Sequence, residues 1–100
     1  MRIGTTPKHI FNLPIDTDDI KTLEITYEQG GTVKLQKKKD ECECDGKVVT
    51  VKLTQEDTFK FHHNEYIRVQ VRVLLNDGSV LESEIEKVDA EECLSSEVLE

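Results

Sequence analysis

Apolar and polar residues alternate along most of this chain. Residues 67–73 are the clearest case, running Ile-Arg-Val-Gln-Val-Arg-Val, and residues 23–28 run Leu-Glu-Ile-Thr-Tyr-Glu. Shorter stretches of the same kind lie at residues 33–36 and 49–53. Because successive side chains of a strand point to opposite faces, each stretch predicts a strand with one buried face.

Turn-forming residues separate these predicted strands. Gly30-Gly31 follows the first of them and predicts a hairpin with residues 33–36. Asp45-Gly46 precedes residues 49–53, and Asn76-Asp77-Gly78 ends residues 67–73. The chain is expected to return through residues 80–88 as a second hairpin. A further strand is expected at residues 9–13, where Pro14 ends it.

Two short stretches favour a helix. Thr54 has an acidic residue three positions later, a capping pattern that predicts one short helical turn near residues 54–58. Residues 89–94 begin with acidic side chains, which are favourable at a helix N-terminus. We therefore expect residues 89–100 to be an acidic C-terminal segment that forms a short helix or a frayed tail.

Six to seven short strands separated by turns are typical of an all-β domain. We predict an immunoglobulin-like β-sandwich of antiparallel strands over residues 1–88, with a small five-stranded barrel as the alternative. The resemblance to immunoglobulin domains is one of architecture only, because the chain has three cysteines, no tryptophan and hence no Cys…Trp…Cys pattern.

Acidic residues dominate the charge, with 21 acidic against 13 basic side chains and a net charge of −8. Eight of the acidic residues, and a single lysine, lie in residues 82–100. This excess disfavours nucleic acid as a partner, because the phosphate backbone is bound mainly by Lys and Arg. It favours either a solvated surface or contact with a basic protein.

No apolar run approaches the roughly 20 residues that a membrane-spanning helix needs. The N-terminal residues lack the apolar stretch of a secretory signal, so we expect the protein to stay inside the cell that makes it.

The candidate metal ligands are few and scattered: Cys42, Cys44, His62, His63 and Cys93. A single residue between two cysteines is an uncommon spacing for zinc, and adjacent histidines on extended chain point to opposite sides. We predict no metal and no cofactor. Neither a phosphate-binding glycine loop nor a nucleophile beside a base is present, so we also predict that the protein is not an enzyme.

The candidate interaction residues lie on the polar face of residues 67–73 and on the acidic strand after the turn. They are Arg68, Gln70, Arg72, Glu82, Glu84 and Glu86. Side chains two residues apart share a face, so the arginines and the glutamates are expected to face one another across the hairpin. Such pairs stabilise a hairpin by roughly 0.2–1 kcal/mol each. The alternative is a protein-binding surface.

Several segments together resemble a family of short proteins carried by prophages of Gram-positive bacteria. They are the opening Arg-Ile-Gly-Thr-Thr-Pro, the hairpin at residues 23–31, Val-Lys-Leu-Thr-Gln-Glu-Asp-Thr at residues 51–58 and the segment 67–78. The resemblance extends from Arg2 to about Cys93. More remotely, the layout is similar to the immunoglobulin-like N-terminal domain of phage baseplate upper proteins.

This resemblance implies a virion, baseplate or assembly accessory role without catalysis. It implies a tail or baseplate protein as the partner, with self-association as a second option, and a location in the bacterial cytoplasm or the virion. The acidic segment leaves an alternative open, namely a small acidic regulator or inhibitor that binds a basic surface of a host protein.

Overall fold

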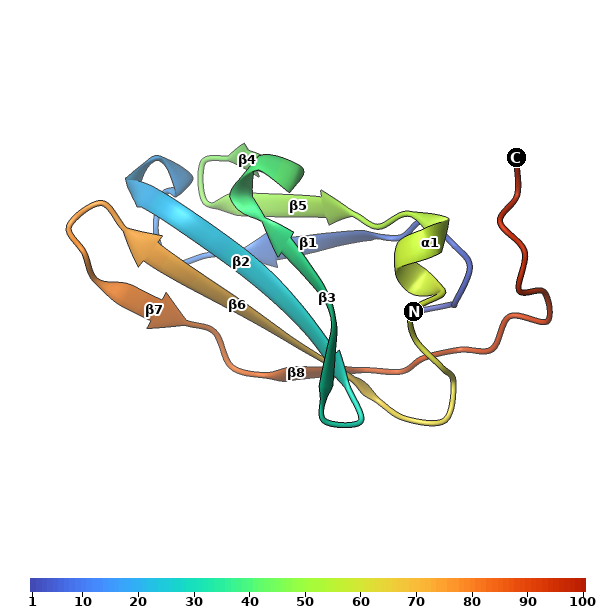
Figure 1. The fold of residues 1–100 in the computed structure, drawn as a ribbon. Helices are drawn as coiled ribbons and strands as arrows, with labels where there is room; N and C mark the ends of the chain where they lie inside the picture. Colours follow the sequence, from blue (N-terminus) through green and yellow to red (C-terminus); the bar gives the residue numbers. More distant parts are fainter.

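The computed structural model describes residues 1–100, which form eight strands in two antiparallel sheets (Figure 1). The strands are β1 (Lys8–Asn12), β2 (Ile20–Gln29), β3 (Thr32–Lys38), β4 (Glu43–Asp45), β5 (Val48–Lys52), β6 (Ile67–Leu75), β7 (Val80–Glu82) and β8 (Glu86–Val88). One α-helical turn, α1 (Gln55–Thr58), and two 3₁₀ turns, η1 (Thr17–Asp19) and η2 (Lys39–Glu41), connect them. The predicted all-β, sandwich-like fold is confirmed. Its immunoglobulin-like character stays a prediction.

The strand order differs between the two sheets. The small sheet has the order β1-β5-β4. The large sheet has the order β3-β2-β6, and both β7 and β8 then pair with the other side of β6. The alternation pattern predicted one returning strand and gave no signal for β4, so the predicted count of six to seven strands is too low by at least one.

The apolar side chains of the alternating segments meet between the sheets. In β6 the residues Ile67, Val69, Val71 and Val73 are buried, whereas those between them are exposed or half-buried. A cluster of 14 buried residues from both sheets forms the core. Removing this apolar surface from water is the main stabilising contribution to folding.

The predicted turns lie where the glycines allow them. Gly30 and Gly31 have φ angles of 62° and 83°, in the region that favours glycine, and they join β2 to β3. The predicted helical turn is confirmed as α1. The Thr54 hydroxyl accepts a hydrogen bond from the Asp57 amide at 3.0 Å, and the Asp57 carboxylate accepts one from the Thr54 amide at 2.9 Å.

The returning segment after Gly78 is broken into β7 and β8 instead of forming one strand. Between them, the Ser83 hydroxyl accepts a hydrogen bond from the Val71 amide at 2.9 Å, while the Ser83 amide donates to the Val71 carbonyl at 2.8 Å. A side chain thus replaces a main-chain acceptor at this point of the ladder, which is how serine competes with regular secondary structure.

The helical alternative for residues 89–94 is wrong, because this segment is extended. Glu91 forms a parallel bridge with Arg2, and its amide donates to the Met1 carbonyl at 2.8 Å. Its carbonyl accepts from the Ile3 amide at 3.0 Å. The backbone groups that a helix would use are therefore bound to the N-terminal residues.

None of the helical turns has the length and apolar character that crossing a membrane requires.

Candidate protein-interaction surface

One partly buried polar pair lies between β1 and β2. The hydroxyl of Tyr27, which is fully buried, lies 2.6 Å from His9 Nδ1. Burial raises the pKa of the Tyr27 hydroxyl. Burial, aided by the positive charge of the N-terminus, lowers the pKa of His9. A protonated phenol and a neutral imidazole are a matched donor and acceptor, so this pair is satisfied internally.

Gln29 holds the loop between α1 and β6. Its Nε2 donates to the His62 carbonyl at 2.6 Å and to the Glu65 carbonyl at 2.9 Å. Its Oε1 accepts from the His62 amide at 2.9 Å. The side chain is buried and takes the place of main-chain partners for this loop.

A buried ion pair closes the sandwich on the side where η2 connects the sheets. Lys37 Nζ of β3 lies 3.0 Å from Asp57 Oδ2 of α1 and 3.7 Å from Glu41 Oε2 of η2. Burial raises the pKa of the Asp57 carboxyl, but hydrogen bonds from the Thr54 amide and from Lys37 outweigh it and keep the pKa below its ordinary value. Every buried side-chain polar atom in the protein has a hydrogen-bond partner.

The candidate metal ligands do not come together. Cys42 is half-buried after η2, and Cys44 is exposed on β4. His63 instead lies beside Glu92, with 3.3 Å between Nε2 and Oε2. Cys93 is half-buried, with its sulfur beside Gly4. No three His, Cys, Asp or Glu side chains gather in an arrangement that could hold a metal ion.

The Cys42 thiol is the cysteine with a perturbed environment. Burial, together with Cys44 and Glu41, raises its pKa to about 11. It donates a hydrogen bond to the Lys38 carbonyl at 3.3 Å. Because the thiolate is the nucleophilic form, this cysteine is weakly reactive at neutral pH.

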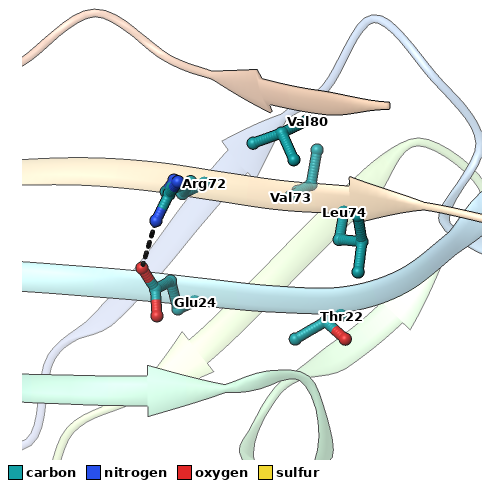
Figure 2. A pocket seen from close by; sticks show the side chains of 6 residues that line it. All are labelled: Thr22, Glu24, Arg72, Val73, Leu74 and Val80. Carbon is teal, nitrogen blue, oxygen red and sulfur yellow. Dashed lines mark ion pairs between the residues drawn. The ribbon is translucent and has the colours of Figure 1, made fainter. Parts of the chain in front are cut away.

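The arginines lie on the outer face of the large sheet, but their partners are not the predicted ones. Arg68 pairs with Glu28 at 2.8 Å, and Arg72 pairs with Glu24 at 3.9 Å, as Figure 2 shows for the second pair. Both glutamates belong to β2, which pairs with β6 over most of its length. The predicted ion pairs across the β6–β7 hairpin are therefore wrong.

Gln70, the third polar residue on this face, does reach the returning segment. Its Nε2 donates to the Ser83 carbonyl at 3.0 Å. Gln70 therefore binds the backbone of the segment between β7 and β8 and does not bind an acidic side chain.

The three glutamates of the returning segment are exposed and do not share one face. Glu82 lies opposite Arg72, on the outer side, whereas Glu86 lies opposite the buried Val69 and is on the core side. The break at residues 83–85 causes this difference. None of Glu82, Glu84 and Glu86 takes part in an ion pair, although Arg72 is the register neighbour of Glu82.

Strand β7 has a depression on each of its faces. The outer one has a volume of about 240 Å³, and Figure 2 shows Val80 and Leu74 beside the Arg72–Glu24 pair. The inner one, of about 170 Å³, is an apolar groove between the end of β1 and β7. Asn12, Leu13, Pro14, Ile15, Val71, Val73, Leu81, Glu82 and Ser83 line it.

This groove was not predicted from the sequence. The apolar residue Leu81 in the returning segment was the available signal, and its side chain is exposed. Leu13 and Ile15 carry no strand pattern that would place them opposite Leu81.

Comparison of the chain with protein-family models, with curated proteins and with solved structures finds no match.

Proposed function

We propose that this protein is a non-enzymatic interaction module that serves a bacteriophage particle or its assembly. The observation that supports this function best is the position of the exposed apolar side chains. Six of the nine large ones follow residue 79, namely Val80, Leu81, Ile85, Leu94, Val98 and Leu99. Two of them, Val80 and Leu81, lie on the edge strand β7, and exposed apolar residues on a free edge are typical of a protein–protein interface.

The contacts of the buried polar side chains also support a non-enzymatic module. The buried polar side chains bind one another, as His9 binds Tyr27 and Lys37 binds Asp57, instead of converging on a cleft. A module of this kind binds through a sheet face or a free strand edge, which requires only backbone groups and pockets for alternate side chains. The resemblance to prophage proteins supports the assignment to a phage.

Pairwise binding measurements test this function. The tagged chain is mixed with each tail and baseplate protein encoded in the same prophage, and binding is followed by calorimetry. We expect at least one of them to form a stable complex, and we expect the protein to copurify with that partner. A folded protein that binds none of them, and is absent from purified particles, would contradict the proposal.

The unpaired acidic residues favour a second candidate, a regulator that binds a basic protein of the host. A chain that ends at Glu92 and carries Glu82→Gln, Glu84→Gln and Glu86→Gln tests it, because it removes the unpaired carboxylates while keeping Glu91, which binds the N-terminal residues. If these carboxylates carry the binding, the variant abolishes it, and salt weakens the binding of the native chain steeply through screening. Binding that survives both the charge removal and high salt would remove this candidate.

A further inference from the structure

We propose that the free edge of β7, with the apolar groove beside it, binds an extended basic segment of a partner protein as an added strand. This inference rests on the proposed function, because it names the docking site and the chemistry of the partner. Three features of the molecule support it: the unpaired edge, the groove and the charge at the edge.

Strand β7 pairs only with β6, so its other edge is free. The amide of Ser83 donates to Val71, and the amide of Leu75 donates to Ser79. Hydrogen-bonded and non-hydrogen-bonded pairs alternate along an antiparallel ladder, so the backbone groups of Val80 and Glu82 face away from β6. They are the groups to which an added strand would bind.

The groove lies on the open side of the sandwich. On the opposite side, η2 joins β3 to β4, and the Lys37–Asp57 pair closes the gap between the sheets. Here the end of β1 and the edge of β7 stay apart, with Leu13 on one wall and Leu81 on the other. A strand added to β7 would point every second side chain into this groove, because side chains alternate between faces.

The charge at the edge of β7 indicates which kind of partner segment would bind there. Glu24 and Glu28 inside the large sheet are paired with basic side chains, whereas Glu82, Glu84 and Glu86 at the edge are exposed and unpaired. Lysine or arginine on the outward positions of an added strand would lie opposite Glu82, the carboxylate of β7 on the outer side. Opposite charges on neighbouring strands are favourable, and like charges are not.

The same charge excludes two other occupants. A second copy of this chain, paired edge to edge, would place the acidic residues of two β7–β8 segments against each other. The chain's own C-terminal residues are also acidic, with Glu97 and Glu100 among them. The partner is therefore a basic segment with alternating apolar side chains from another protein.

Calorimetric titration with synthetic peptides tests this site. The probe is a capped peptide that alternates lysine and valine, and the matched control alternates glutamate and valine. We expect the lysine peptide to bind and the glutamate peptide to show no binding. Failure of the lysine peptide to bind, or equal binding of both peptides, would overturn the proposal.

Matched variants locate the binding. Leu81→Lys puts a charge into the groove, and we expect it to lower the affinity for the lysine peptide about tenfold. Glu82→Gln tests the charge alone and is expected to weaken binding severalfold. The controls are Val33→Lys, at an exposed apolar position on the far edge strand β3, and Glu97→Gln in the tail, neither of which should change binding. Thermal melting confirms that each variant is folded.

The two proposals fail in different ways. A phage protein that binds the native chain and the Leu81→Lys variant equally would overturn this docking site and leave the proposed function standing. If no phage protein binds while the lysine peptide binds at the Leu81 groove, the proposed phage role fails and the docking site stands.

Discussion

Replacing Asp57 with asparagine removes the charge that holds β3 against α1. The Lys37 and Asp57 side chains are only 13% and 11% exposed, and their charged atoms lie 3.0 Å apart. Unit charges at this distance attract by about 5–6 kcal/mol at an effective dielectric constant of 20, and lost hydration offsets most of this. Removing one partner of a buried pair costs about 3–5 kcal/mol.

Glu41 reduces this cost, because it lies 3.7 Å from Lys37 and remains as a partial partner. We therefore expect Asp57→Asn to lower the free energy of unfolding by about 2–3 kcal/mol. Asp57→Ala also removes the acceptor for the Thr54 amide and should cost about 1 kcal/mol more. Lys37→Met combined with Asp57→Asn should cost less than the sum of the two single variants, because they share one interaction.

Urea unfolding at several pH values is the assay. The pKa of Asp57 is lower in the folded protein than its ordinary value. Its contribution is therefore present above the unfolded pKa of about 3.9 and is lost as the pH falls through the folded pKa. The difference in the free energy of unfolding between the native protein and Asp57→Asn should have its largest value at neutral pH and shrink below about pH 4. A difference under about 0.5 kcal/mol at neutral pH, within the range of ordinary surface substitutions, would refute the reasoning.

Two further predictions concern the other buried polar groups. Gln29→Leu leaves three backbone groups of the loop without their partner, so we expect a loss of about 2–4 kcal/mol and faster amide exchange in residues 61–66. Gln36→Leu, at an exposed glutamine of β3, is its control, and equal effects of the two would contradict the assignment. His9 has a lowered pKa in the folded state, so the unfolded state binds more protons and stability should fall as the pH drops below about 6.5. Replacing His9 with glutamine should remove this part of the pH dependence, and an unchanged slope would show that the His9–Tyr27 pair is not its source.

The parts of the fold that depend on local physics could be predicted from the sequence. Alternation over residues 67–73 identified β6, and Gly30-Gly31 identified the β2–β3 hairpin. The errors lie where distant groups decide the structure. Ser83 breaks the returning strand because its hydroxyl meets the Val71 amide. Glu91 is extended because its backbone binds the N-terminal residues. Neither partner can be recognised from the local pattern.

The candidate surface could be predicted only in part, for the same reason. The outward direction of Arg68 and Arg72 follows from alternation alone. Their partners in β2 depend on strand order, which a hairpin pattern does not contain. The acidic residues of the returning segment, which are nearer in sequence, were the wrong choice. The groove unites Leu13 with Leu81 from opposite ends of the chain, so only the folded structure reveals it.

Amide hydrogen exchange in the presence of a bound partner tests the proposed docking at β7 most directly. The amides of Val80 and Glu82 face the free edge, so they should exchange rapidly in the free protein. If a partner strand adds to β7, both amides become protected in the complex, because they donate hydrogen bonds to the added strand. Protection confined to the β3 edge, with Val80 and Glu82 still exchanging rapidly, would contradict docking at β7.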